Sequence, residues 1–156
     1  MKRATLIFPV KNGKVTLAKK KLKVGVGLWN GYGGKEEDVD KGSMKRCAVR
    51  EFAVETDGAR IRIEDLDLVA HVDFYKAGVY IFECHVYFAD EWEGEIKETR
   101  EMGPPKEFSA QDLPLDEMMP GDRLWLERVF SGERIRAKVF YNADNTEVLD
   151  FHSEPL

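Results

Sequence analysis

The chain has 156 residues, 43% of them hydrophobic and 34% charged, and its formal net charge at pH 7 is −5. This balance is typical of a soluble globular protein and excludes a disordered one. The negative charge argues against broad electrostatic binding to nucleic acid, and no apolar run is long enough to cross a bilayer. We therefore expect neither a nucleic-acid partner nor a membrane partner.

The chain length suits one domain with a sizeable core, and we expect residues 1–156 to form that domain. The basic start of the chain is followed by only a short apolar run that Pro9 closes, so no signal peptide is predicted. Cys47 and Cys84 lack the paired spacing of a metal site and are expected to be small core residues in a reducing compartment. These features predict a cytoplasmic protein.

Residues 4–10 and 15–18 are predicted strands, joined by a tight hairpin turn that contains an Asn-Gly pair, Asn12-Gly13. Four lysines follow within residues 19–23. A basic cluster is in most proteins a solvated surface. This one leads directly into a glycine-rich segment, where Gly31, Gly33 and Gly34 are predicted to form a turn that excludes side chains.

An acidic run follows the glycines, and then Ser43 is predicted to cap a helix. The apolar positions that recur at helical spacing are Met44, Cys47, Ala48 and Phe52. Glu51 and Glu55 are four residues apart on this helix, so their carboxylates lie on one face and repel each other. A hard cation such as Mg²⁺ relieves this repulsion, whereas most helix-face glutamates are simply solvated.

Residues 66–75 and 79–88 are two further predicted strands, and His71 and His85 fall inside them. No third partner for these histidines is visible in the sequence, so no zinc site is predicted. Residues 90–101 form an acidic loop, and residues 106–109 a short strand. A second helix is predicted to open at Pro120 and to end at Gly132, before a closing hairpin of residues 136–141 and 147–151. This pattern predicts an α+β layered domain.

The glycine pair, the acidic loop, the segment Arg50-Glu51-Phe52-Ala53-Val54-Glu55 and Gly58 together resemble the signature of the Nudix hydrolases. Two departures stand out. The loop before the helix is two residues longer than in the signature, so either Asp40 or Glu37 stands in for its glutamate. The Glu-Glu pair of the signature reads Val54-Glu55 here, and the glycine comes one residue late.

Two alignments accommodate the second departure. In one, Val54 replaces the first glutamate of the pair, Glu55 is the second, and Asp57 is inserted after them. In the other, a residue is inserted inside the helix as a π-bulge, so that Glu55 takes the first role and Thr56 the second. In both, one of the three helix carboxylates of the family is missing.

The resemblance extends to the segment Trp29-Asn30-Gly31-Tyr32-Gly33-Gly34-Lys35, to residues 113–126 and to the closing hairpin, which look like those of the oxidised-purine nucleoside triphosphate diphosphatases of that family. It implies a Nudix-like α/β/α layered fold with a mixed central sheet. It also implies that Mg²⁺, or Mn²⁺ in its place, assists the attack of water on a triphosphate to give a nucleoside monophosphate and pyrophosphate. The implied partner is a small nucleotide, and no oligomeric state is predicted.

The resemblance also implies roles for individual residues. Glu51 and Glu55 would be catalytic, and Arg50 would orient them. The metal ligands implied by the resemblance are Gly34, Glu51, Glu55 and Glu101, the last from a separate loop. Lys20 would contact substrate phosphate.

Base recognition in these relatives uses an asparagine, matched here by Asn30, and a Trp-Pro-Asp-Asp motif. This chain reads Met119-Pro120-Gly121-Asp122 at that motif, so Met119 replaces an aromatic residue and Gly121 replaces an aspartate. An amide and a carboxylate can read the donor and acceptor edges of a purine. We therefore expect purines to be preferred over pyrimidines, with weaker discrimination for oxidised guanine than in the relatives.

Overall fold

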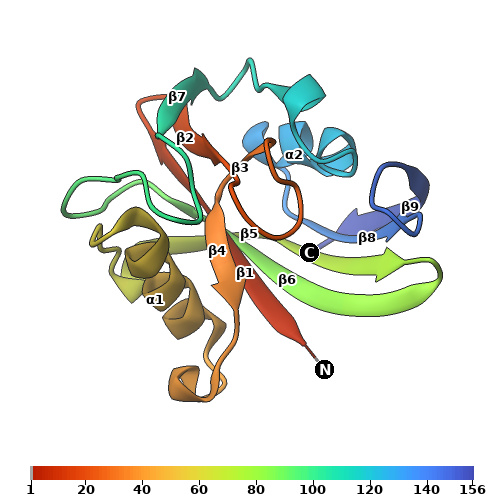
Figure 1. The fold of residues 1–156 in the computed structure, drawn as a ribbon, viewed down its shortest axis with the longest axis horizontal. Helices are drawn as coiled ribbons and strands as arrows, with labels where there is room; N and C mark the ends of the chain where they lie inside the picture. Colours follow the sequence, from red (N-terminus) through yellow and green to blue (C-terminus); the bar gives the residue numbers. More distant parts are fainter. Residues whose placement is uncertain (1) are drawn as a thin grey trace.

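The computed structural model describes residues 2–156 as a mixed sheet with helices against it (Figure 1). The strands follow the order β3-β2-β1-β6-β5-β8-β9, while β4 pairs with β1 and β7 pairs with β2. The pairs β1·β6 and β5·β8 are parallel and the others antiparallel. The strands are β1 (Arg3–Lys11), β2 (Lys14–Lys19), β3 (Trp29–Asn30), β4 (Tyr32–Lys35), β5 (Leu66–Lys76), β6 (Val79–Ala89), β7 (Lys106–Ser109), β8 (Ile135–Tyr141) and β9 (Val148–Pro155).

Two α-helices lie against the sheet, α1 (Met44–Thr56) and α2 (Asp122–Phe130). The short 3₁₀ helices are η1 (Asp38–Asp40), η2 (Ile63–Asp65) and η3 (Leu115–Glu117). Ile7 and Phe8 are neighbours in β1 and point to opposite faces, as successive strand residues must. Ile7 packs in the cluster that contains Phe52 of α1, and Phe8 in the cluster that contains Trp125 of α2. The predicted α+β class with a mixed central sheet is confirmed.

Local sequence signals account for the ends of several elements. Asn12 and Gly13 both have positive φ, 55° and 75°, which is the conformation of the predicted Asn-Gly hairpin turn. Ser43 caps α1 as predicted, since its hydroxyl accepts a hydrogen bond from the backbone N–H of Arg46. Asp57 ends the helix in the left-handed conformation, with φ 58°.

The glycine-rich segment forms strands instead of the predicted turn. Gly33 and Gly34 belong to β4 and pair with Leu6 and Thr5 of β1. Neither has positive φ, so conformational freedom is not the reason for glycine here. A Cβ at Gly33 would collide with the carbonyl of Thr5, and one at Gly34 with the carboxylate of Glu51. A close approach does exclude side chains, but the approaching groups belong to the chain itself.

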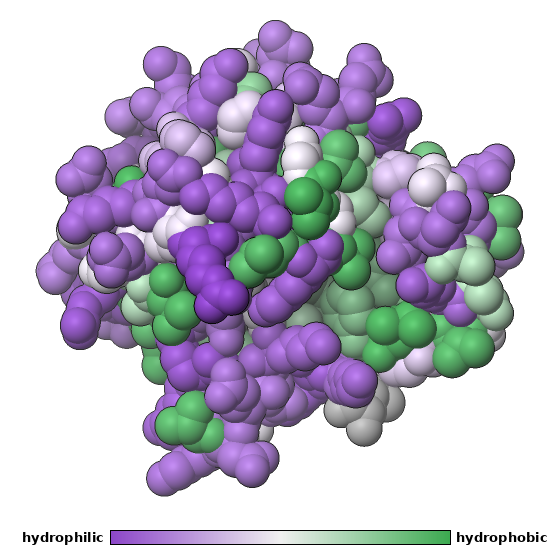
Figure 2. Space-filling view, in the orientation of Figure 1, coloured by the Kyte–Doolittle hydropathy of each residue, from purple (hydrophilic) through white to green (hydrophobic). Residues whose placement is uncertain are grey.

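The remaining differences from the predicted elements are small. The second helix begins at Asp122 instead of Pro120 and ends at Phe130, and β9 continues to Pro155. Within residues 2–156, no helix combines the length and the apolar character that crossing a membrane requires. Hydrophilic side chains cover most of the face shown in Figure 2, and the apolar ones lie in small groups among them.

Candidate active site

Glu51 and Glu55 project from α1 onto the backbone of β4. The side chain of Glu55 is buried, and its Oε1 accepts a hydrogen bond of 2.8 Å from the backbone N–H of Gly33. The carboxylate of Glu51 lies against the Cα of Gly34, in the space that a side chain there would fill. The two glycines therefore let the helix pack on the strand while both carboxylates remain between them.

Arg50 holds Glu51 in place by connecting α1 to the acidic loop that precedes it. Its guanidinium donates two hydrogen bonds of 2.8 Å to the two carboxylate oxygens of Asp40. It also donates one of 2.6 Å to Oε1 of Glu51. Bidentate pairs of this kind fix geometry as well as contributing energy. The carboxylate of Glu51 is therefore held by Arg50, which is itself anchored on Asp40.

Asp40 is the better candidate of the two residues proposed to stand in for the loop glutamate. Its side chain is only 2% exposed, whereas that of Glu37 is 63% exposed and makes a single 3.1 Å contact with Arg50. The hydrogen bonds from Arg50 lower the pKa of Asp40 to about 2. A buried carboxylate that stays ionised through its arginine partner is a structural support for the site.

The geometry of α1 favours the alignment in which Val54 replaces a glutamate. The helix is α-helical from Met44 to Thr56, without a π-bulge. The hydroxyl of Thr56 donates to the carbonyl of Phe52 (2.6 Å) and accepts from the N–H of Ala59 (3.1 Å), so it is occupied away from the carboxylates. The extra residue is Asp57 at the left-handed end of the helix. Val54 itself is 62% exposed.

Glu101 reaches the same site from the loop between β6 and β7. Its carboxylate accepts a hydrogen bond from the carboxyl group of Glu55, which lowers the pKa of Glu101. Burial raises the pKa of Glu55, and the hydrogen bond and negative charge of Glu101 raise it further. Glu55 therefore carries the proton that the two carboxyl groups share in the absence of a cation.

Lys20 lies beside these two carboxyl groups at the end of β2. Burial lowers the pKa of its ammonium group, while the charges of Glu55 and Glu101 act in the opposite direction. Lys23 is also close, with its Nζ 3.5 Å from Glu101 Oε1. Lys20, Glu55 and Glu101 thus lie close to one another, and Glu51 lies against Gly34, the neighbour of the glycine that holds Glu55; we call these four residues the carboxylate end of the candidate site. Gly34 is the backbone ligand that the resemblance implies, and its carbonyl accepts a 3.4 Å hydrogen bond from the Thr5 hydroxyl.

The residues predicted to read the base lie on β3 and at the start of α2. The side-chain Oδ1 of Asn30 accepts from the N–H of Gly31 (2.8 Å), which fixes the orientation of its amide. Asp122 is buried, and burial raises its pKa to about 7. Met119 is half-buried, and its Sδ packs against Gly25 in the loop between β2 and β3. We call Asn30 and residues 119–122 the base end.

Gly121 packs directly on a residue that the sequence did not single out. Its N–H donates a 2.9 Å hydrogen bond to the hydroxyl of Tyr141, at the end of β8. A Cβ at Gly121 would lie 2.5 Å from this hydroxyl and 2.9 Å from Val139. Tyr141 therefore fills the space that an aspartate at position 121 would need. The glycine itself was the only sequence signal of this packing.

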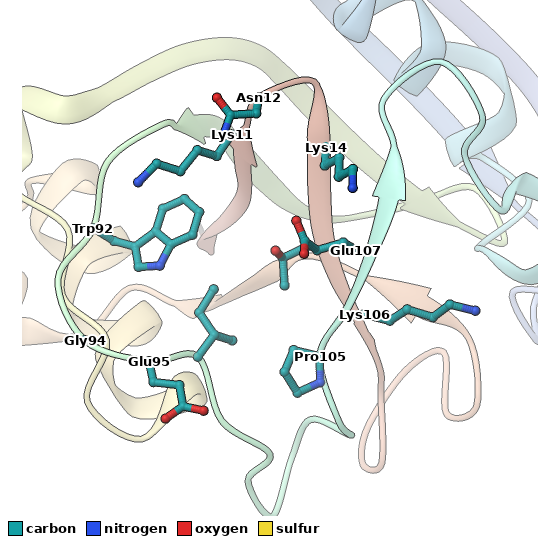
Figure 3. Close-up of a pocket in the computed structure, with 11 residues that line it drawn as sticks. Lys11, Asn12, Lys14, Trp92, Gly94, Glu95, Pro105, Lys106 and Glu107 are labelled. Carbon is teal, nitrogen blue, oxygen red and sulfur yellow. The ribbon is translucent and has the colours of Figure 1, made fainter.

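A cavity of about 630 Å³ lies away from these groups, between the β1–β2 hairpin, β7 and the loop that follows β6 (Figure 3). Lysine and glutamate side chains are among those that line it, including Lys11, Lys14, Glu95 and Glu107. No residue predicted from the sequence to act in the site lines it. Shape alone therefore does not lead to the candidate site, which is identified by its converging carboxyl groups.

The family model of the NUDIX domain matches residues 1–129. The chain belongs to the Nudix hydrolases. An oxidized purine nucleoside triphosphate hydrolase of Danio rerio is 32% identical over 134 residues, which are 85% of this chain and 82% of that protein. The enzyme of the same description from Mus musculus is 30% identical over 122 residues, 78% of this chain and 74% of that protein.

Solved structures of Nudix proteins show the same fold. The mMutator MutT protein from Bacillus halodurans matches this Nudix hydrolase with a TM-score of 0.80 at 23% identity, covering 100% of this chain and 99% of that one. A MutT NUDIX hydrolase from Burkholderia pseudomallei matches with a TM-score of 0.68 at 25% identity, over 82% of this chain and 97% of that one. The family predicted from the sequence, its enzyme class and its fold are thereby confirmed.

Proposed function

We propose that this Nudix hydrolase cleaves purine nucleoside triphosphates, oxidised ones included, to nucleoside monophosphate and pyrophosphate in a Mg²⁺-dependent reaction. The observation that carries the proposal is the placement of Glu51 and Glu55 against Gly34 and Gly33, with Glu101 hydrogen-bonded to Glu55. The printed descriptions of the relatives from Danio rerio and Mus musculus support the substrate class.

The donor set of the carboxylate end fits a hard cation. Glu51, Glu55 and Glu101 offer carboxylate oxygens, the ligands that Mg²⁺ and Mn²⁺ prefer, and Glu55 is held protonated when no cation offsets its neighbour. When bound, the cation neutralises charge on the phosphates and lowers the pKa of water. The resemblance adds Gly34 as a further ligand.

Hydrogen bonds within the chain hold the two glutamates of α1 in place. Arg50 holds Glu51 through a 2.6 Å hydrogen bond, and Gly33 holds Glu55 through one of 2.8 Å. Glu55 would hold a cation in its deprotonated form, so binding would compete with its proton and the cation affinity would rise with pH. Lys20, whose ammonium lies beside these carboxyl groups, attracts the triphosphate.

The base end supports a purine preference with relaxed specificity. Asn30 offers an amide, and Asp122 a carboxyl group whose pKa of about 7 lets it donate as well as accept a hydrogen bond. Tyr141 fills the space beside Gly121, so the second aspartate of the relatives has no counterpart. Oxidised and unmodified dGTP are therefore expected to be hydrolysed with similar kcat/KM.

The test is pyrophosphate release from a panel of purine and pyrimidine triphosphates, with oxidised dGTP included, in the presence and absence of Mg²⁺. Metal-dependent release that favours purines is the expected result. A strong preference for oxidised dGTP over dGTP would contradict the relaxed specificity. Release that does not depend on a divalent cation would contradict the proposed chemistry.

The exposed Val54 favours a second candidate function. Because a carboxylate of the family is missing from α1, the domain would bind nucleotides and turn them over slowly or not at all. Nucleotide would then raise the melting temperature by mass action without pyrophosphate release. In a third outcome, the protein would hydrolyse only another nucleoside diphosphate derivative. The proposed roles of the carboxylates would then stand, and the base end would need a different role.

The whole chain, residues 1–156, is proposed to act as one domain, and its cellular location is proposed to be the cytoplasm. The two buried free cysteines, Cys47 and Cys84, suit a reducing compartment.

A further inference from the structure

Three side chains with metal-binding atoms meet on β5 and β6, outside the carboxylate end. His71 of β5 pairs directly with His85 of β6, and Glu83 stands two residues before His85 on the same face of the sheet. His85 also pairs with Thr5 of β1, whose hydroxyl lies 3.7 Å from Cys47 of α1. The cluster therefore lies on the face of the sheet that α1 partly covers.

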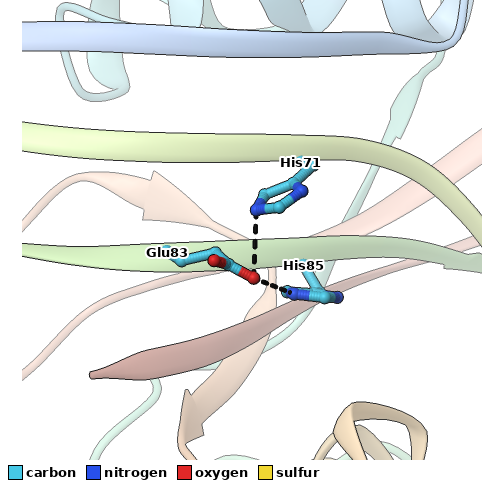
Figure 4. A group of neighbouring side chains, drawn as sticks. All are labelled: His71, Glu83 and His85. Atoms are coloured by element: carbon cyan, nitrogen blue, oxygen red, sulfur yellow. Dashed lines mark hydrogen bonds and ion pairs between the residues drawn. The ribbon is translucent and has the colours of Figure 1, made fainter. Parts of the chain in front are cut away.

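Both imidazoles point at the carboxylate of Glu83 (Figure 4). Its Oε1 lies 3.0 Å from Nε2 of His71 and 2.6 Å from Nε2 of His85. One oxygen atom thus stands between two ring nitrogens, and the available ligand atoms of the three residues all lie within 4.8 Å of one another. The side chains are 12–19% exposed, which leaves the cluster accessible from one side.

Hydrogen bonding within the cluster does not satisfy His71. Its Nε2 is buried and, although near Glu83, makes no well-aligned hydrogen bond with any group in residues 2–156. Burial lowers the pKa of His71, the negative charge of Glu83 acts against this, and the positive charge of Arg136 on β8 adds to it. A buried polar atom without a partner is costly. A bound metal ion would give this nitrogen the partner that it lacks among the described residues.

We propose that His71, Glu83 and His85 bind a divalent transition-metal ion of the Zn²⁺ class. Two imidazoles and one carboxylate are a recurring ligand set for Zn²⁺ and its neighbours in the first transition row, whereas Mg²⁺ and Ca²⁺ prefer oxygen donors alone. The site is chemically distinct from the carboxylate end, which has no histidine. It does not depend on the nucleotide chemistry proposed above.

Little movement is needed to admit the ion. Ligand bonds of about 2.1 Å in tetrahedral geometry separate two donor atoms by about 3.4 Å. The His71 and His85 contacts to Glu83, 3.0 and 2.6 Å, therefore need to open by less than about 1 Å. Small rotations of the three side chains supply such a change.

The surroundings favour three protein ligands instead of four. Asp73 pairs with Glu83 across the strands, and its Oδ1 lies 4.0 Å from Nε2 of His71. The hydroxyl of Tyr80 donates a 3.1 Å hydrogen bond to the same oxygen, which holds Asp73 back from the cluster. The negative charge of Asp73 and the positive charge of Arg136 shift the pKa of His71 in opposite directions. A fourth position is left for water or another small ligand.

Calorimetric titration with Zn²⁺, and with Co²⁺ as a visible-absorbing substitute, tests this site. The titration uses the Glu51→Gln chain, which weakens cation binding at the carboxylate end. One ion should bind per chain, and His71→Asn, His85→Asn or Glu83→Gln should each weaken it about 10- to 100-fold or more. His152→Asn, which removes the third histidine of the sequence from exposed β9, is the matched control and should leave the affinity unchanged.

A readout that needs no variant keeps the proposal testable if a substitution prevents folding. In the unsubstituted chain, Zn²⁺ should shift the ring resonances of His71 and His85 and leave those of His152 in place. The melting temperature should rise with Zn²⁺ concentration by mass action. Zn²⁺ binding that survives both histidine substitutions, or the absence of any ring shift at His71 and His85, would overturn the proposal.

Discussion

At the carboxylate end the side chains are held by ion pairs and hydrogen bonds to charged groups. At the base end the packing contacts are between neutral groups. Arg50 joins Asp40 to Glu51, and the backbone of Gly33 holds Glu55. At the base end, the carboxyl group of Asp122 is buried and is hydrogen-bonded to the backbone of Met119. The loop between β2 and β3 spans both, since it carries Lys23 near Glu101 and Gly25 against Met119.

This difference indicates which positions of the site tolerate substitution. Removing Arg50 would leave the carboxylate of Asp40 buried without its partner, which is strongly destabilising. A neutral contact at the base end, such as Gly121 against the Tyr141 hydroxyl, can be replaced at a lower cost. The departures from the relatives at Met119 and Gly121 lie at this second end. The departure at Val54 lies on the exposed face of α1 and breaks none of these contacts.

The largest effect is expected from Glu51→Gln, which should lower Mg²⁺-dependent pyrophosphate release about 10²- to 10⁴-fold. Glutamine keeps the shape of the side chain and still accepts from Arg50, so the melting temperature should stay close to that of the unsubstituted chain. Glu64→Gln, at a side chain that is 68% exposed in η2, is the control and should retain full turnover. Loss of activity in both variants would contradict the assignment of Glu51.

Arg50→Ala tests the ion pair between Arg50 and Asp40. It leaves Asp40 buried without its partner, and the free energy of unfolding should fall by roughly 3 kcal/mol, the lower end for a buried pair because the arginine is 25% exposed. The folded-state pKa of Asp40 is about 2, below its ordinary value, so this stabilisation is present above about pH 4 and is lost as the pH falls toward 2.

Urea unfolding at pH 7 and pH 3 measures that difference. The gap between Arg50→Ala and the unsubstituted chain should narrow at the lower pH. Arg62→Ala, which breaks an exposed contact with Asp65, is the matched control and should have a much smaller effect at either pH. A gap that is the same at both pH values would mean that Asp40 is not the partner that matters.

The base end should show the opposite dependence on pH. Burial raises the folded-state pKa of Asp122 to about 7, so its contribution to stability is fully present below the unfolded-state value and is lost as the pH rises through 7. Between the unfolded-state value, about 4, and 7 the loss should approach about 1.4 kcal/mol for each pH unit, and it should level off above 7. Melting temperatures of the metal-free chain from pH 5 to pH 9 should fall less for Asp122→Asn.

The folded-state pKa of Glu55 is also raised, so Glu55 too lowers the stability as the pH rises. The melting temperature of Asp122→Asn should therefore still fall with pH, although less steeply. Mg²⁺ should remove the part due to Glu55 and leave the part due to Asp122. Asp116→Asn, at an exposed residue of η3, serves as the control and should leave the profile unchanged. A profile of Asp122→Asn identical to that of the unsubstituted chain would show that Asp122 does not titrate in this range.

The smallest effect is expected from Val54→Glu, which supplies the missing carboxylate one turn from Glu51. Turnover at limiting Mg²⁺ should rise about tenfold, in the range that a metal-site group contributes. Val54→Gln adds the same bulk without the charge and should not reproduce the gain. If neither variant differs from the unsubstituted chain, the site does not depend on this position.

The sequence predicted the elements whose signals are local. The Asn12-Gly13 turn, the Ser43 cap and the pairing of Glu51 with Glu55 on one helix face all depend on residues a few positions apart. The glycine-rich segment was misjudged because the preference for glycine comes from β1 and α1, which lie far away in the sequence. Its strand character depends on pairing with β1 that no local pattern reveals.

Two features of the sites depend on long-range geometry in the same way. Tyr141 reaches Gly121 across 20 positions, so its effect on the base end could not be read locally. A register shift between Phe74 and Tyr75 sets the pairing of His71 with His85. Without that irregularity His71 would face Cys84, and the two imidazoles would lie on opposite faces of the sheet. The missing third partner, Glu83, becomes visible only once this register is known.

The hydrogen bond from Gly33 to Glu55 gives the chain a built-in spectroscopic probe. The amide proton of Gly33 points at the carboxyl group whose charge changes when a proton leaves or a cation arrives. Its ¹H and ¹⁵N chemical shifts should therefore follow the occupancy of the carboxylate end directly. A single backbone resonance then reports cation binding in a mixture, without a substrate and without any label beyond nitrogen.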